Sequence, residues 1–233
     1  TLVNVDSLAR LSETISECRK CDRLVEWREK VALEKRAAYR TQEYWGRGVP
    51  GFGDPNAKVM IIGLAPAAHG ANRTGRVFTG DRSGDFLFAS LFRTGFANQP
   101  SATHLHDGLA LEDAYVTAAV RCAPPANKPT PEERDSCRPF IEKELELLGE
   151  VSVFVALGQF GYQVAASVLG IRPRPRFGHG VVVPIGVQER RPPRHLICSF
   201  HPSQQNTFTG RLTEVMLDEV FLAARDLAGL KRL

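Results

Sequence analysis

The sequence predicts an α/β fold in which a four-stranded parallel sheet is covered by helices on both faces. Four short apolar runs rich in β-branched residues are typical of buried strands, at residues 58–64, 114–120, 151–157 and 195–200. Helical patterns lie between and after these runs, at residues 84–94, 131–148, 160–169 and 212–227. Near-continuous apolar strands that alternate with helices indicate a parallel sheet with both faces buried.

Length and composition indicate an ordinary globular protein. The 233 residues are 43% hydrophobic and 24% charged, enough to bury one substantial core, so we expect a single domain over residues 1–233. No apolar run approaches the roughly 20 residues of a membrane-spanning helix, and the N-terminal residues lack a signal-peptide pattern, so we expect a cytoplasmic protein. The formal net charge of +4 suits an anionic partner such as nucleic acid, although many unrelated proteins carry as much.

Local signals place two helix starts and two loops. Thr130-Pro131-Glu132-Glu133 has the composition of a helix start and begins the pattern over residues 131–148. Asp81, followed by Arg-Ser-Gly, is at least as well suited to starting the next helix as to chemistry. Prolines gather at residues 124–131 and 173–193, which predicts irregular loops between packed elements.

The chemically unusual residues follow the predicted strands. Residues 64–70 (Leu-Ala-Pro-Ala-Ala-His-Gly) follow the first strand, residues 121–127 (Arg-Cys-Ala-Pro-Pro-Ala-Asn) the second and residues 201–203 (His-Pro-Ser) the fourth. Ligands of parallel α/β sheets bind outside the carboxyl ends of the strands. We therefore expect these three segments to converge on one rim of the sheet.

Four of the five cysteines form two pairs. Two residues separate Cys18 from Cys21, and fourteen separate Cys122 from Cys137. A reducing cytoplasm disfavours disulfides, so a metal is the better explanation. Zinc most often uses two tight pairs, whereas iron-sulfur clusters tolerate irregular spacing, and the spacing leaves a cluster, zinc and unrelated thiols all open. Cys198 lies within the fourth apolar run and is expected to be a small buried hydrophobe.

Five ordered motifs together resemble the uracil-DNA glycosylase superfamily, and most closely its family 5, the prokaryotic branch that carries an iron-sulfur cluster. The motifs span nearly the whole chain. They are Cys18-x-x-Cys21, Gly-Leu-Ala-Pro-Ala-Ala-His-Gly at 63–70, Gly-Arg-Val-Phe-Thr-Gly at 75–80, the segment 121–127 and His-Pro-Ser at 201–203.

The resemblance implies a three-layer α/β/α sandwich, a 4Fe-4S cluster on Cys18, Cys21, Cys122 and Cys137, and hydrolysis of the N-glycosidic bond of deaminated bases in base excision repair. The cluster would clamp the N-terminal segment against the loop that ends at Asn127, which makes it a structural element rather than the reactive centre. Zinc is the alternative occupant.

The resemblance also assigns roles within the pocket. Phe78 matches the aromatic that stacks on uracil, with a plain core phenylalanine as the alternative. His201 matches the donor that stabilises negative charge on the departing base, with a structural histidine as the alternative. Further substrate contacts are expected from the first and last motifs, namely Ala65, Ala68, His69 and Ser203.

This chain departs from better-known branches at two points. Those branches carry a carboxylate or asparagine in the first motif to position the attacking water, whereas Ala67 and Ala68 stand here. An asparagine is thought to hold the water in family 5, and we expect Asn127, or alternatively Asn72, to do so. Related branches also place a base-reading asparagine after the threonine of the second strand. Ala118 follows Thr117 here, which predicts a relaxed choice among uracil, hydroxymethyluracil, hypoxanthine and ethenocytosine.

DNA contacts are expected around the same rim. Phe208 is the candidate wedge for the gap left by a flipped nucleotide, with Gln204 in the same loop. Arg211 and Arg73, together with Arg76 and Arg121, are candidate phosphate contacts. The rim motifs contain no lysine, which argues against a lyase step and predicts a monofunctional enzyme. We also expect a monomer. The alternative is a metal-stabilised nucleic-acid-binding module without catalysis.

Overall fold

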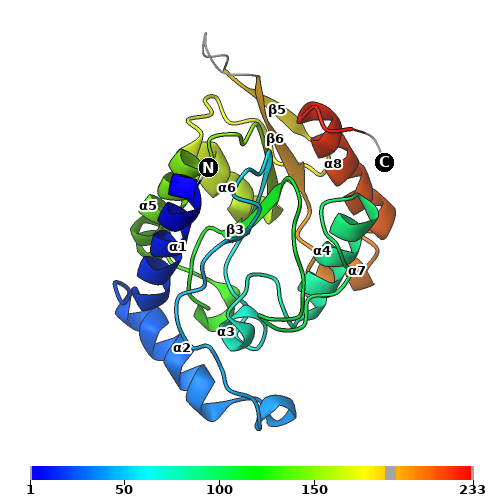
Figure 1. Ribbon diagram of the computed structural model, residues 1–233. Coiled ribbons are helices and arrows are strands. Elements are labelled where there is room, and N and C mark those ends of the chain that lie inside the picture. Colours follow the sequence, from blue (N-terminus) through cyan, green and yellow to red (C-terminus); the bar gives the residue numbers. More distant parts are fainter. Residues whose placement is uncertain (1, 187–192, 232–233) are drawn as a thin grey trace.

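A six-stranded mixed sheet forms the centre of the computed structural model, which describes residues 2–186 and 193–231 (Figure 1). The strands are β1 (Phe52–Gly53), β2 (Val59–Gly63), β3 (Ala114–Ala118), β4 (Val153–Leu157), β5 (Val182–Ile185) and β6 (Arg194–Ser199). Their order across the sheet is β1-β3-β2-β4-β6-β5. The inner four are parallel, and β1 and β5 pair antiparallel at the edges.

The α/β prediction is confirmed, and its four strands correspond to the inner strands of the sheet. The predicted number of strands is wrong, because β1 and β5 were not foreseen. β1 has only two residues, and β5 lies within the proline-rich segment 173–193 with mostly exposed or half-buried side chains. β1 is too short to show an apolar run, and Pro184 interrupts the run of β5, where a proline argues against a strand. Residues 187–192 of that segment lie outside the described residues.

Eight α-helices surround the sheet in the described part of the chain. They are α1 (Leu2–Glu17), α2 (Asp22–Glu34), α3 (Ala71–Thr74), α4 (Arg82–Arg93), α5 (Pro131–Leu147), α6 (Gly158–Val168), α7 (Gln204–Phe208) and α8 (Glu214–Leu227). Single 3-10 turns lie at Ala37–Tyr39 and Pro125–Asn127. Among the described residues we find no helix with the length and apolarity needed to span a membrane.

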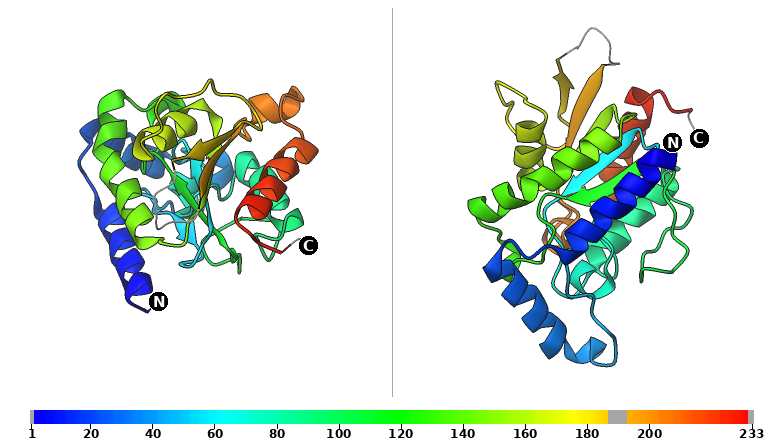
Figure 2. Two further views of the ribbon diagram at one scale, coloured as in Figure 1. Left: turned by 90° about the horizontal axis from the view of Figure 1, so that it is seen from above. Right: turned by 60° about the vertical axis from the view of Figure 1, so that its left-hand side comes forward.

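The helices form two layers because the strands bury both faces. In β2, Val59 and Ile61 pack into the cluster that contains α4 and α8, whereas Met60 and Ile62 pack into the cluster that contains α5 and α6. This alternation is the two-residue period of a strand. Figure 2 shows α4 and α8 on one side of the sheet and α1 and α5 on the other. The structure is thus the three-layer α/β/α sandwich.

The N-terminal helices were not predicted from the sequence. α1 packs against α5, and α2 extends beyond the sheet (Figure 1). α2 buries Leu24, Val25, Arg28 and Val31, so a charged residue occupies its buried stripe. An arginine at such a position weakens the apolar period that identifies an amphipathic helix.

Both predicted helix starts are confirmed by their hydrogen bonds. The Thr130 hydroxyl accepts from the Glu133 N–H at 3.3 Å, and the Glu133 carboxylate accepts from the Thr130 N–H at 2.8 Å. Together they complete a capping box. The Asp81 carboxylate accepts from the Gly84 N–H at 2.9 Å and caps α4.

A buried ion pair joins β3 to α5. Arg121 follows the strand and donates two hydrogen bonds to the Glu144 carboxylate, at 2.9 and 2.7 Å. Arg121 is 1% exposed and Glu144 is fully buried. Thr117 donates to the same carboxylate at 2.8 Å. Each charge compensates the other, because either one alone would carry a large desolvation penalty in the protein interior.

We expect Glu144→Gln to destabilise the protein by about 3–5 kcal/mol, because it leaves the Arg121 guanidinium buried without a counter-charge. Urea denaturation followed by circular dichroism measures the change in the free energy of unfolding. Glu142→Gln is the matched control on the same helix. It breaks the half-exposed pair with Arg138 and should cost under about 1 kcal/mol. Equal effects of the two substitutions would contradict the role assigned to the buried pair.

Candidate active site

The carboxyl ends of β2, β3 and β6 lead to one cavity of about 390 Å³. Its lining comes from the three segments predicted to converge, with additions from the start of α4. The lining residues are Leu64, Ala65, Ala67, Phe78, Asp81, Ser83, Asn127, His201, Ser203 and Gln205. A wider hollow of about 740 Å³ shares six of these residues and continues toward His69, Arg36 and Tyr39. The predicted convergence on one rim is therefore found.

Phe78 and His201 lie together in the smaller cavity. Their ring centroids are 5.8 Å apart with planes at 34°. Gly63 gives the Phe78 ring its place at the end of β2, since a Cβ there would lie 2.6 Å from the ring. Gly158 likewise leaves space for His201, since a Cβ at Gly158 would lie 3.1 Å from the histidine Cβ. Two glycines thus leave room for the two rings at adjacent strand ends.

The environment of His201 keeps its ring neutral. Burial lowers the pKa of His201 to about 4, because desolvation penalises the imidazolium. Near neutral pH the ring therefore has one N–H that can donate a hydrogen bond. It needs no change of protonation to act as a donor toward a polar atom of a bound ligand.

Asn127 and Asp81 are two further polar residues of the cavity wall. Asn127 is exposed and has a left-handed backbone, φ 56°, directly after Ala126 at 53°. Asparagine tolerates this conformation better than most residues. Asp81 lines both hollows while capping α4, and burial raises the pKa of its carboxyl despite the Gly84 and Ser83 N–H groups. Asp81 therefore serves the helix and also borders the cavity.

Asn72 lies outside both hollows. It is fully buried, and its amide nitrogen donates to the carbonyl oxygens of Arg28 at 3.2 Å and Ala68 at 3.4 Å. These bonds tie the first motif to α2. The structure therefore gives Asn72 a different position from Asn127, the other candidate for holding water.

The other expected substrate contacts divide between the two hollows. Ala65 borders the smaller one, Ala68 and His69 border the wider one, and Ser203 borders both. The Nδ1 atom of His69 lies 3.1 Å from the Tyr44 hydroxyl. Burial, with the nearby positive charges of Arg36 and Arg73, lowers the pKa of His69.

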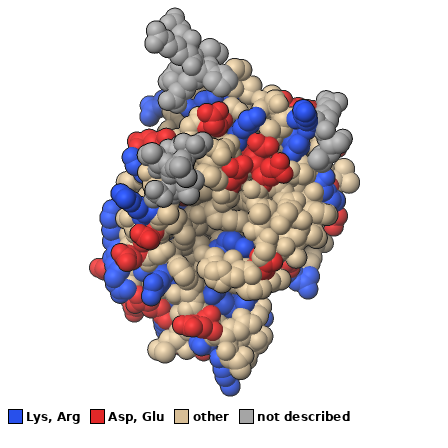
Figure 3. Space-filling view, in the orientation of Figure 1, with Lys and Arg blue, Asp and Glu red and all other residues tan. Residues whose placement is uncertain are grey.

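Three of the four rim arginines point into the protein. Arg73 donates to the His69 and Gly80 carbonyls and to the Gln42 side chain. Arg76 pairs with Asp107 at 2.7 Å, and Arg121 pairs with Glu144 as described. These guanidinium groups are occupied by internal contacts, so they are poorly placed to bind phosphate. On the face that Figure 3 shows, lysines and arginines are interspersed with acidic residues and form no single basic surface.

The loop after His201 does face solvent. Gln204 is exposed, and Phe208 at the end of α7 is 70% exposed with the Arg82 guanidinium 5.5 Å from its ring centroid. Arg211 is exposed and lies over the Phe200 ring at 4.6 Å. The rim thus offers one projecting aromatic ring and one outward arginine next to the cavity.

The four paired cysteines gather on the far side of the loop that ends at Asn127. Cys122 and Cys137 form an apolar cluster with Leu24 and Val120, and Cys21 packs against it. The buried guanidinium of Arg28 joins Cys18 to this group. It donates to the Cys122 sulfur and to the Cys18 carbonyl oxygen, each at 2.9 Å.

The character of this thiol cluster fits a thiolate-bound metal group. Burial raises the pKa of the Cys122 thiol to about 12, so a thiolate there requires a cation to stabilise it. Within the described residues no three histidine, cysteine, aspartate or glutamate side chains already form a metal-binding group. The sulfurs would therefore have to turn toward a common centre. Cys198 is fully buried within β6, as predicted.

Comparison with known proteins places this arrangement in a family. A model of the uracil DNA glycosylase superfamily matches residues 50–225. The chain belongs to this superfamily. It is similar to the type-5 uracil-DNA glycosylase of Mycobacterium tuberculosis, with 52% identity over 97% of this chain and 83% of that protein. It is also similar to the type-5 uracil-DNA glycosylase of Thermus thermophilus, with 50% identity over 94% and 97%.

Several residues that border the two hollows were missed by the sequence reasoning. Ser83 and Gln205 border the smaller cavity, and Arg36 and Tyr39 border the wider one. Ser83 and Gln205 adjoin recognised motifs, so their neighbourhood offered a signal. Arg36 and Tyr39 follow α2, and only the fold brings that segment to the rim.

We expect the His201 ring to titrate near pH 4 in an NMR titration. The unfolded chain has an ordinary histidine pKa of about 6.5, so protonation of the unfolded state removes stability as the pH falls from about 6.5 toward about 4. His201→Gln should abolish that part of the pH dependence of the free energy of unfolding. A ring that titrates near 6.5 in the folded protein contradicts the desolvated site.

Proposed function

We propose that the protein removes uracil from DNA by hydrolysing its N-glycosidic bond and leaves an abasic site, as a step of base excision repair. The observation that carries the proposal is the pairing of Phe78 with neutral His201 in the cavity at the ends of the strands. The similarity to type-5 uracil-DNA glycosylases over most of the chain supports it.

The site suits an extruded base. A base within a duplex is out of reach of such a cavity, so the nucleotide must rotate out of the stack at a cost of a few kcal/mol. Phe78 would stack on the base, and the His201 N–H would donate to a pyrimidine oxygen. As the bond between base and sugar breaks, its electron pair moves onto the base, and a donor in a desolvated site stabilises that charge.

Water must then attack the sugar carbon from which the base departs. Asn127 is an amide on the cavity wall in a loop of left-handed backbone, and we assign it the role of orienting this water. Asp81 is the one carboxylate among the described residues that line the smaller cavity. It is the group we assign to take up the proton that the attacking water releases. Asn72 lies behind the wall and is assigned to positioning the first motif.

The pocket should accept more than one base. Ala118 is buried in the cluster against which Phe78 packs, and its methyl group cannot read the edge of a base by hydrogen bonding. A site that does not require a particular hydrogen-bonding partner discriminates less strongly against analogues. We therefore extend the proposed substrates to hydroxymethyluracil, hypoxanthine and ethenocytosine.

The proposed reaction stops at base release. The residues that line the two hollows at the site include no lysine, so these walls offer no amine for a Schiff base with the abasic sugar. Phe208 and Arg211 are assigned to the DNA, with Phe208 entering the space left by the flipped nucleotide and Arg211 contacting a phosphate. Gln204 is assigned to the same contact surface.

We further propose that Cys18, Cys21, Cys122 and Cys137 hold a 4Fe-4S cluster, with zinc as the alternative. The all-sulfur donor set and the gathering of the thiols support this assignment. When bound, the group would cross-link α2 to the segment around Asn127 and to α5. An ion pair already links two of these elements, since Arg23 of α2 pairs with Glu133 of α5 at 2.7 Å.

We expect the protein to convert a uracil-containing oligonucleotide into an alkali-labile strand. His201→Ala should lower kcat by about 100- to 1000-fold, the loss typical of one preorganised donor. His106→Ala, which alters an exposed histidine, is the control and should leave kcat unchanged. Equally uncut strands with wild type and His201→Ala would instead favour a module that binds nucleic acid without catalysis.

The same assay with the other three bases in place of uracil tests the base range. Release of uracil alone contradicts the relaxed pocket and leaves the glycosylase assignment intact.

We expect iron and sulfide analysis to give about four of each per chain in a brown protein. Cys137→Ser should lose the iron, because three thiolates remain, whereas Cys198→Ala should retain it, because Cys198 lies in the core of the sheet. A colourless protein with one tightly held zinc per chain would replace the cluster by zinc. A metal-free protein with full stability and activity would contradict both.

A further inference from the structure

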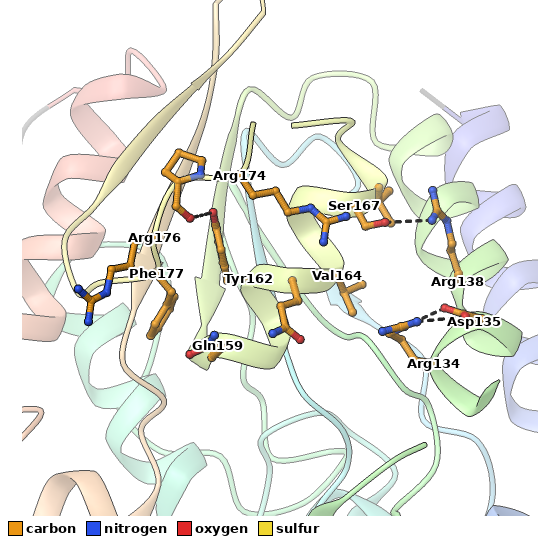
Figure 4. A pocket seen from close by; sticks show the side chains of 13 residues that line it. Arg134, Asp135, Arg138, Gln159, Tyr162, Val164, Ser167, Arg174, Arg176 and Phe177 are labelled. Carbon is orange, nitrogen blue, oxygen red and sulfur yellow. Dashed lines mark hydrogen bonds and ion pairs between the residues drawn. The ribbon is translucent and has the colours of Figure 1, made fainter. Parts of the chain in front are cut away.

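A separate hollow lies between α5, α6 and the segment before β5 (Figure 4). It shares no lining residue with the two hollows of the proposed active site. Its volume is about 740 Å³. Four arginines and one carboxylate, that of Asp135, are among its lining residues. The arginines are Arg134, Arg138, Arg174 and Arg176. The hollow is thus strongly basic, and none of the roles assigned above uses it.

Two of these arginines belong to a segment that we call the arginine strap, residues 172–177, with the sequence Arg-Pro-Arg-Pro-Arg-Phe. Its three arginines are exposed. Proline fixes its own φ and favours extended backbone in the residue before it, so the strap is stiff without belonging to a helix or strand. The Tyr162 hydroxyl donates to the Pro175 carbonyl oxygen, and the Tyr162 and Phe177 ring centroids are 5.7 Å apart.

The strap arginines differ from the other two in their charge balance. Arg134 pairs with Asp135 at 2.8 Å and Arg138 with Glu142 at 2.6 Å. In the described ranges, Arg174 and Arg176 form no ion pair with a carboxylate. Figure 4 shows Arg174 extended across the hollow toward Ser167, and Arg176 turned away from it. Their charges are therefore available to an anionic partner.

Aromatic contacts connect the strap to the active-site loop. Phe177 packs on Phe200 with ring centroids 6.2 Å apart, and His201 is the next residue after Phe200. Arg211 lies over the same Phe200 ring. The strap and the loop assigned to DNA are thus connected through one shared ring, that of Phe200.

We propose that the arginine strap binds backbone phosphates of the DNA duplex, on one side of the nucleotide that enters the active site. The inference rests on the proposed function, since it places the duplex at the His201 rim. Guanidinium groups bind phosphate oxygens through paired charge-assisted hydrogen bonds, and a stiff segment loses little entropy on binding. The contact with the His201 rim through Phe200 favours DNA over an acidic peptide, which would also suit the charge of the hollow.

The test is the salt dependence of binding to an undamaged duplex, measured by fluorescence anisotropy with wild type and with R174Q/R176Q. Each lost phosphate contact should reduce the slope of log K against log salt concentration by about 0.9, so the double variant should be shallower by up to about 1.8. The control is K58Q/K231Q. Lys58 precedes β2 and Lys231 follows α8, so both lie at the opposite edge of the sheet.

Shortening the duplex locates the contact. The duplex contains a single uracil, and base pairs are removed from one flank at a time. The difference in salt slope between wild type and R174Q/R176Q should vanish when one flank is removed and persist when the other is removed. Uracil release from a saturating short oligonucleotide should be equal for both proteins, because neither arginine lines the active site. An unchanged melting temperature would show that the variant is folded.

An identical salt slope for wild type and R174Q/R176Q would overturn the strap assignment while uracil release stands. If wild type then also binds a fluorescent glutamate-rich peptide and the variant does not, the strap would be assigned to an acidic protein partner. Absence of uracil release with a strap-dependent slope would instead overturn the proposed function alone.

Discussion

The buried pair of Arg121 and Glu144 fixes the part of the molecule on which the rest of the site depends. Arg121 ends the segment that continues β3, and Cys122 and then Asn127 follow it in the chain. Glu144 lies on α5 seven residues after Cys137, so both point from the same face of the helix. One bidentate contact thus sets the position of the Asn127 loop and brings Cys122 and Cys137 together.

Arginine has two opposite uses in this fold. Arg28, Arg73, Arg76 and Arg121 are buried and connect segments that lie far apart in the chain. Arg211 and the arginine strap point to solvent. The formal net charge of +4 therefore says little about how DNA is attracted, because these buried guanidinium groups are engaged in internal contacts. The arginines that can attract DNA are those that stay exposed, such as Arg211 and the arginines of the strap.

The sequence could predict elements whose own residues carry the signal. The inner strands and α4, α5, α6 and α8 follow from apolar periods, and the cap of α5 follows from Thr130 and Glu133. The signals of the edge strand β5 and of α2 are weaker, because Pro184 interrupts the apolar run of β5 and the charged Arg28 occupies the buried stripe of α2. In the same way, nothing local separates Asn72 from Asn127 or Arg73 from Arg211. The difference arises when α2 covers Asn72 and Gln42 and Gly80 engage Arg73.

The cavity couples its chemistry to its packing. Phe78 and Asn127 both have left-handed backbones, a conformation that costs free energy and persists only where the surroundings impose it. Phe78 lies beside His201 on the cavity wall, where burial lowers the histidine pKa. The same burial strengthens each hydrogen bond that the ring donates, because both effects follow from low local polarity. With alanines at positions 67 and 68, the first motif supplies no carboxylate. The carboxylate on the cavity wall comes instead from Asp81 at the start of α4, and the neutral His201 ring is placed to stabilise the departing base.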